Sequence, residues 1–124
     1  MLTPVATLSP VLLAGGDAGT LAANVARLDA ALGSLQAADP HLELVLLPLG
    51  CLSGGAGLAT PWRATASAAL PDVSPLAALS RVAATRRLWI AGAERFAGAA
   101  WGFLLDADGR CAAAQPHIGA SEGE

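Results

Sequence analysis

The segment from Leu42 to Gly57 reads L-E-L-V-L-L-P-L-G-C-L-S-G-G-A-G, an apolar run that passes into a glycine-rich loop. The run from Leu44 to Leu47 does not alternate with polar residues and is followed by Pro48, a pattern that predicts a strand buried on both faces. In open α/β sheets, ligands bind beyond the carboxyl ends of the strands. Chemistry is therefore expected just after this strand, where Cys51 is the one reactive side chain between residues 49 and 52.

The other elements follow from apolar spacing, caps and breakers. Apolar residues at helical spacing predict a helix from Leu21 to Leu35, with Thr20 as its N-cap. A second helix is predicted to follow the N-cap Ser74 and to end near Thr85. The remaining predicted elements are a strand over Val5–Leu8, a short helix around Trp62–Ala69, a strand over Leu88–Ala91, and a hairpin in which Trp101–Leu105 and Arg110–Ala114 flank the turn Asp106–Gly109.

Composition and charge narrow the class of protein. The order of elements indicates one α/β domain over residues 1–124, with residues 115–124 as a frayed tail. No apolar run is long enough for a membrane span, and the N-terminus shows no signal-peptide pattern. Net charge is −3 and all seven basic residues are arginine without a basic cluster, so nucleic-acid binding is not expected. Two cysteines without metal-ligand spacing predict a cytoplasmic protein with reduced thiols, no metal and no cofactor.

The quoted segment resembles a motif of the carbon–nitrogen hydrolase (nitrilase) superfamily, an apolar strand that ends in Pro-Glu and is followed by Ser/Thr-Gly. Pro48 matches the proline, Ser53-Gly54 matches the second pair, and Leu49 stands where the family has its catalytic glutamate. The helix that carries Asn24 and the segments L-P-D-V-S-P-L-A-A-L-S-R-V-A, L-W-I-A-G-A-E-R and L-L-D-A-D-G-R follow in the family's order. The resemblance implies the first half of an α-β-β-α sandwich, a mixed sheet with two helices on one face.

The resemblance also implies a chemistry, in which a thiol attacks an amide or nitrile with the help of a glutamate base and a lysine. Leu49 replaces the glutamate, and the chain has no lysine. Depending on the alignment, Gln115 or His117 falls at the lysine position, and the nucleophilic cysteine belongs to the family's second half. Glu122 or Glu124 would match a supporting glutamate, although a solvated acidic terminus is the simpler interpretation.

Cys51 is the only nucleophile near the apparent site. A reactive thiolate needs a nearby cation or a helix N-terminus. His41 lies at the other end of the same strand, out of reach along an extended backbone. We therefore expect Cys51 to pack as a small apolar residue.

Three functions remain open. The first is a non-catalytic structural or interaction subunit that associates with itself or with a larger protein. The second is one half of a heteromeric amide or nitrile hydrolase that another chain completes. The third is a nucleotide-binding domain, because L-A-G-G-D-A-G-T from Leu13 to Thr20 resembles a phosphate-binding loop. Leu49 and the missing lysine favour the first. We further expect Leu49 to face apolar side chains, and one sheet face to be left uncovered by the chain and so to drive assembly.

Overall fold

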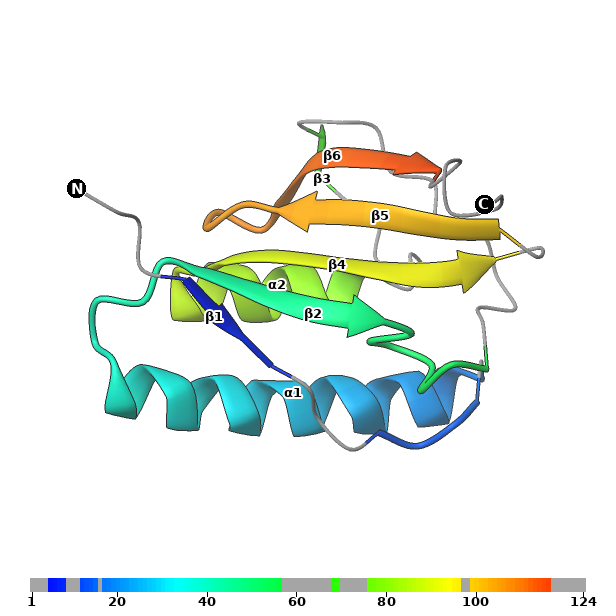
Figure 1. Cartoon of the computed structure of the whole chain (residues 1–124), viewed down its shortest axis with the longest axis horizontal. Helices are drawn as coiled ribbons and strands as arrows, with labels where there is room; N and C mark the ends of the chain where they lie inside the picture. Colours follow the sequence, from blue (N-terminus) through cyan, green and yellow to red (C-terminus); the bar gives the residue numbers. More distant parts are fainter. Residues whose placement is uncertain are drawn as a thin grey trace.

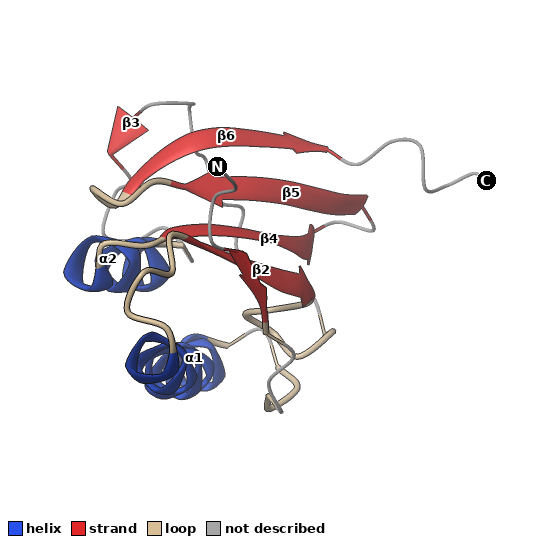
Figure 2. Cartoon of the chain, turned by 60° about the vertical axis from the view of Figure 1, so that its left-hand side comes forward, coloured by secondary structure: helices blue, strands red, loops and turns tan. Residues whose placement is uncertain are grey.

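The computed structural model describes residues 5–8, 12–15, 17–56, 68–69, 76–96 and 99–116. The elements in this part of the chain are β1 (Val5–Thr7), α1 (Ala18–Ala38), β2 (Leu44–Leu49), β3 (Ala68–Ala69), α2 (Ala77–Arg86), β4 (Trp89–Phe96), β5 (Ala99–Leu105) and β6 (Arg110–Pro116). The strands form one six-stranded sheet in the order β1-β2-β4-β5-β6-β3. Both helices lie on the same face of the sheet (Figure 1 and Figure 2). The predicted mixed sheet with two helices on one face is confirmed.

Strand direction follows from the connections. The strands β1, β2 and β4 are parallel, because α1 and α2 form the crossovers between them. The strands β4, β5 and β6 are antiparallel neighbours. The predicted hairpin turn joins β5 to β6, where Gly109 has a φ of +84° and the Asp106 side chain accepts hydrogen bonds from the backbone N–H groups of Asp108 and Arg110. The local sequence signal for this turn was therefore sufficient.

The N-terminal boundary of α1 differs from the prediction. Asp17, not Thr20, is the N-cap, and its Oδ2 accepts a hydrogen bond of 3.0 Å from the Thr20 backbone N–H. The Thr20 hydroxyl donates to the other Asp17 oxygen at 2.7 Å. These hydrogen bonds lower the pKa of the Asp17 carboxyl. The Asp17 carboxylate thus satisfies the backbone N–H of Thr20, which has no partner within the first helical turn. For this reason the helix begins at Ala18.

β2 is longer than predicted, and it is not buried on both faces. It continues through Pro48 to Leu49, with an irregular register against β4 between Leu46 and Leu49 that accommodates the missing proline N–H. Val45 and Leu47 are buried, whereas Leu46 is 39% exposed. The apolar run therefore reflects one covered face and one bare apolar face.

Other boundaries were predicted less well. Ala68–Ala69 form β3 and not the end of a helix, while residues 62–67 of that predicted helix lie outside the described residues. The proposed N-cap Ser74 also lies outside them, and α2 ends at Arg86, one residue later than expected. Gln115 and Pro116 belong to β6, so the predicted tail is wrong at its first two positions; residues 117–124 are outside the described part.

The core lies between the helices and the sheet. Its fully buried large side chains come from both layers, and they include Leu28, Leu32, Leu79, Val45, Ile90 and Leu105. The buried positions of α1 follow the helical spacing seen in the sequence. Packing of this apolar stripe against the inner sheet face is the main source of stability for both helices.

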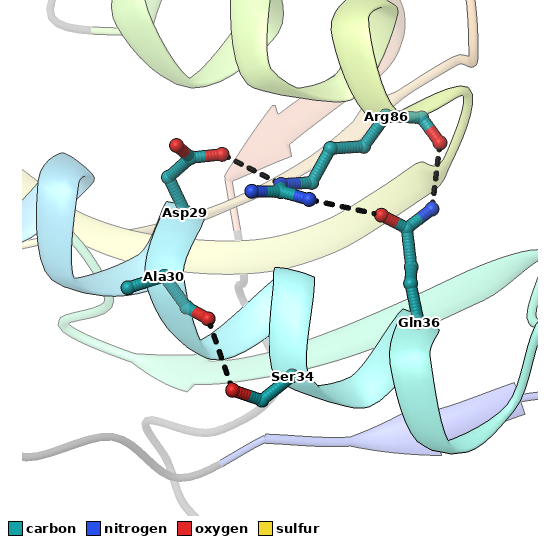
Figure 3. A network of polar contacts seen from close by, with 5 residues as sticks. All are labelled: Asp29, Ala30, Ser34, Gln36 and Arg86. Atoms are coloured by element: carbon teal, nitrogen blue, oxygen red, sulfur yellow. Dashed lines mark hydrogen bonds and ion pairs between the residues drawn. The ribbon is translucent and has the colours of Figure 1, made fainter.

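A polar clamp joins the last residue of α2 to the C-terminal half of α1 (Figure 3). The Arg86 Nε atom of α2 donates to Asp29 Oδ1 of α1 at 2.6 Å, and its Nη1 donates to Gln36 Oε1 at 3.1 Å. Gln36 returns a hydrogen bond of 2.8 Å to the backbone carbonyl of Arg86. Because the Arg86 side chain is only 26% exposed, this contact sets the approach of α2 to α1 more firmly than a solvated ion pair would.

Candidate functional site

The turn after β2 is the region where the sequence predicted chemistry, and glycines shape it. Gly50 has a φ of +84° and donates its N–H to the Ala93 carbonyl of β4 at 2.9 Å. Gly54 has a φ of +65°, and a Cβ atom there would lie 2.4 Å from the Leu13 carbonyl oxygen. Both a left-handed backbone and a close approach therefore require glycine at these positions.

Glu94 anchors this turn from β4. Its side chain is fully buried, and Oε2 accepts hydrogen bonds from the backbone N–H groups of Leu52 at 2.8 Å and Ser53 at 2.7 Å. Oε1 accepts from the Ser53 hydroxyl at 2.7 Å and from the Arg95 backbone N–H at 2.9 Å. Two carboxylate oxygens thus hold four donors, which compensates for removing the group from water.

Asn24 anchors the same turn from α1. Its Nδ2 donates at 2.7 Å to the carbonyls of both Leu13 and Leu52, and its Oδ1 accepts from the Leu13 N–H at 2.8 Å. The side chain is fully buried. One amide therefore joins α1, the loop after β1 and the turn after β2, and Glu94 ties that turn to β4.

Leu49 does not lie where we expected. Its side chain is 43% exposed, and the prediction that apolar side chains bury it away from water is wrong. The cause is the register shift between Leu46 and Leu49. Strict alternation from the buried Val45 and Leu47 would turn position 49 inward, but an irregularity in one strand reverses the side on which later residues emerge.

Cys51 lies inside the fold. It is fully buried, and its Sγ is 3.6 Å from the Ala93 carbonyl oxygen, to which the thiol donates. Burial, and to a smaller degree the charge of Glu94, raise the pKa of this thiol to about 12. At neutral pH the sulfur remains a protonated thiol without access to solvent. This geometry supports the expected packing role.

The strand register places two of the predicted site positions, Leu49 and Gln115, in one row of paired residues across the sheet. Leu49 pairs with Ala93, Ala93 with Gly102, and Gly102 with Gln115. At roughly 4.8 Å per strand, positions 49 and 115 are about 14 Å apart across the sheet. His117 and Glu122 lie outside the described residues.

In the loop that resembled a phosphate-binding loop, several of the described donors are already occupied. Asp17 accepts from both the N–H and the hydroxyl of Thr20, and the Gly15 N–H donates to the Ser53 carbonyl at 2.9 Å. A phosphate would have to displace these contacts and approach the Asp17 carboxylate, whose charge repels it. This arrangement argues against the nucleotide-binding interpretation.

Sequence reasoning missed the two anchors as site residues. A carboxylate at position 94, three residues after the predicted strand Leu88–Ala91, and an amide within an amphipathic helix are the signals that were available. Within the described ranges, no group of three or more His, Cys, Asp or Glu side chains is placed to hold a metal ion. None of the described helices is long and apolar enough to cross a bilayer.

The side of the sheet on which no described helix lies, which we call the outer face, carries most of the exposed large apolar side chains of the described residues. Its large exposed side chains are Val5 at 48%, Leu46 at 39%, Leu49 at 43% and Trp89 at 40%. Figure 2 shows both helices on the opposite side of the strands. The fold is thus an α/β sheet covered on one side, with an anchored turn that places an apolar residue where the resemblance puts a catalytic glutamate.

Comparison with known proteins identifies the class of this fold. No family model and no curated protein matches the sequence. By structure, the chain is similar to Nit3 of Saccharomyces cerevisiae, a member of branch 10 of the nitrilase superfamily, with a TM-score of 0.55, 14% identity and 89% of this chain covered. It is also similar to a carbon-nitrogen hydrolase from Helicobacter pylori G27, with a TM-score of 0.53, 15% identity and 92% covered.

These likenesses cover only 43% and 40% of the two solved chains. The chain therefore has the fold of a half-length nitrilase-like domain, and the fold that the resemblance implied is confirmed. At such low identity the likeness concerns the fold alone.

Proposed function

We propose that this chain is a non-catalytic, nitrilase-like subunit that acts by binding a protein surface through its outer face. The observation that carries the proposal is Leu49, an exposed leucine at the end of β2 that lies on the outer face beside other exposed apolar side chains. A contiguous apolar patch rimmed by polar residues marks an interaction site more often than a reaction site.

The groups near the turn support binding over hydrolysis. Cys51 is buried as a protonated thiol, with its pKa raised to about 12. The Glu94 carboxylate accepts three hydrogen bonds from the turn and one from the Arg95 backbone N–H of β4, so both of its oxygens are engaged inside the fold. Catalysis of amide hydrolysis needs an accessible nucleophile and a proton acceptor within hydrogen-bond reach of it.

One observation favours a second candidate function. Because the chain spans about two fifths of the two solved chains that it resembles, it could be one half of a carbon–nitrogen hydrolase whose other half is a separate chain. That partner would have to supply the nucleophile, the base and the cation. Both candidates use the outer face for docking, and they differ in whether the complex has activity.

The first test is an assay of ammonia release by the pure chain from a set of aliphatic and aromatic amides and nitriles. We expect no turnover above the heat-denatured chain. Turnover that disappears in the Cys51→Ser variant would contradict the non-catalytic assignment and would make Cys51 a nucleophile.

The second test compares two tagged variants in the native host, with partners quantified by mass spectrometry. Leu46→Arg adds a cation to the outer face, and the control Ala26→Arg adds one to an exposed position of α1. We expect partners of the wild-type chain to be lost from Leu46→Arg and kept by Ala26→Arg. Equal recovery by both variants would exclude the outer face as the binding surface.

A further inference from the structure

Large and small side chains are distributed unevenly over the outer face. The strand pairing arranges its residues in rows, and one row consists of Thr7, Leu46, Ala91, Leu104 and Ala113. A second row consists of Leu49, Ala93, Gly102 and Gln115, and a third of Val5, Leu44 and Trp89. Most of the large exposed side chains thus lie over β1, β2 and the start of β4. The end of β4, with β5 and β6, carries mainly alanine and glycine.

Because of the strand order, the half of the outer face with large side chains can pack against the half with small side chains of a second copy. In the six-stranded order β1-β2-β4-β5-β6-β3, the middle of the sheet lies between β4 and β5 (Figure 1). A two-fold axis parallel to the strands at this point would place β2 of one copy over β6 of a second copy, and β4 over β5. Leu46 of each copy would then lie over Ala113 of the other, since the two residues share a row. The two-fold axis would therefore create this contact between a leucine and an alanine twice, once from each copy.

We propose that a second copy of this chain covers the outer face, stacked sheet against sheet about this two-fold axis. The inference rests on the proposed function, because it identifies the partner of the same surface. A closed two-fold pair uses the same patch on both subunits, which requires the self-complementary relief that the rows provide. Face-to-face sheets of this kind pack about 10 Å apart with interdigitating side chains.

Charge and area agree with a pair of identical chains. None of the residues in the three rows is charged, so the two-fold axis brings no like charges together within them. At strand spacings of about 4.8 Å, the rows cover about 400–500 Å² of flat area per copy. Two copies then bury about 800–1,000 Å² in total, a range whose upper end reaches the lower limit for a specific interface.

The decisive test uses complementary charges in one row. Leu46→Arg and Ala113→Glu each introduce a charge that the stacked pair would bury against an apolar side chain, so we expect each variant alone to be monomeric and its dimer dissociation constant to rise at least about 100-fold. Mixed in equal amounts, the two variants should form a heterodimer, because the arginine introduced at position 46 of one chain would face the glutamate introduced at position 113 of the other. Sedimentation velocity of each protein and of the mixture measures this.

Controls separate misfolding from lost association. Ala26→Arg should sediment as the wild-type chain does, and circular dichroism should show that both outer-face variants are folded. A mixture of Leu46→Arg with Ala113→Arg should stay monomeric.

The possible failures can be distinguished. A wild-type chain that stays monomeric at about 100 µM, or a dimer that Leu46→Arg does not weaken, overturns the self-pair. If the chain is monomeric and Leu46→Arg still loses a partner in the host, the subunit function stands and the occupant is a different protein. If Leu46→Arg changes neither sedimentation nor partner recovery, both proposals fail.

Discussion

Glu94 and Cys51 are both fully buried at the turn after β2, and they have opposite relations to charge. The Glu94 carboxylate is buried with four donors around its two oxygens. The Cys51 thiol is buried with one weak acceptor, the Ala93 carbonyl. The Glu94 side chain is therefore stabilised by the hydrogen-bond donors around it. The Cys51 side chain is kept protonated mainly by its apolar surroundings.

Replacing Glu94 with glutamine should destabilise the fold. The amide group of Glu94→Gln would direct N–H donors at the N–H groups of Leu52 and Ser53 or at Arg95, leaving buried donors unpaired. We expect the free energy of unfolding to fall by about 1–3 kcal/mol, the cost of unsatisfied buried groups. Urea unfolding measures it, and the exposed Glu43→Gln should change it by less than about 0.5 kcal/mol. Equal stability of the two variants would contradict the anchoring role.

Alkaline pH should destabilise the chain through its thiols. The ordinary pKa of 9.0 applies to Cys51 in the unfolded chain, whereas the folded value is about 12. Between these values the unfolded state binds fewer protons than the folded state, so the free energy of unfolding falls as pH rises, by up to about 1.4 kcal/mol per pH unit for each such thiol. Burial also raises the pKa of Cys111.

Between pH 9 and 12 the thiols titrate without interference from tyrosine or lysine side chains, because the chain contains neither residue. Unfolding by urea from pH 8 to 11.5 should show the decline. The Cys51→Ala variant should show a shallower slope, whatever its stability at neutral pH, and Cys111→Ala should remove a further part. A slope that is the same in the wild type and in Cys51→Ala would mean that the thiol is accessible in the fold.

At the scale of elements, α1 carries a glycine in its middle for a steric reason. A Cβ atom at Gly33 would lie 3.0 Å from Arg86 Nη2 and 3.1 Å from Nη1. Glycine costs a helix interior about 0.5–1 kcal/mol relative to alanine. The helix tolerates this because the Arg86 guanidinium occupies the space next to Gly33. That guanidinium clamps α2 to α1 (Figure 3).

The coupling between Gly33 and Arg86 can be measured with a double-mutant cycle. Gly33→Ala should raise the free energy of unfolding by about 0.5–1 kcal/mol in an Arg86→Met background, where no guanidinium occupies the space. In the wild-type background the gain should be smaller or reversed, because the new methyl group displaces the clamp. Urea unfolding of the four proteins provides the cycle, and equal gains in both backgrounds would show that the clamp does not depend on the glycine.

At the scale of the whole molecule, the two faces of one sheet have different roles. The inner face packs on the helices and supplies the core, with Ile90 fully buried. The outer face carries Leu46 at 39% exposure. Stability of the single chain should therefore come from the inner face, and association from the outer face.

A matched pair of truncations tests this division. Ile90→Ala should lower the free energy of unfolding by about 2–5 kcal/mol, as buried isoleucine truncations do. Leu46→Ala should change it by less than about 0.5–1 kcal/mol, since most of its surroundings in the single chain are solvent. Both are measured by urea unfolding at a protein concentration low enough for monomers. A loss of several kcal/mol in Leu46→Ala would mean that part of this same chain covers the outer face.

The local sequence was sufficient for most elements in the described part of the chain. The apolar spacing of α1, the run in β2 and the Asp-Gly turn after β5 depend on residues within a few positions of each other, so their signals can be read directly. The order of these elements also carried the resemblance to the nitrilase fold. The ends of the elements were harder to predict. Asp17 and Thr20, for example, are both suitable N-cap residues for α1, and the sequence alone does not show which of them is used.

The role of the turn after β2 depends on contacts between segments that are far apart in the sequence. The direction of Leu49 depends on a register shift between Leu46 and Leu49, and one shifted residue reverses a strand's faces. The roles of Asn24 and Glu94 depend on bringing together segments 28 and 42 positions apart. A residue's environment is set by partners distant in sequence, whereas its secondary structure is set largely by partners nearby. For this reason the fold and the expectation of an uncovered sheet face could be inferred from the chain, while the exposure of Leu49 and the arrangement of side chains on the outer face could not.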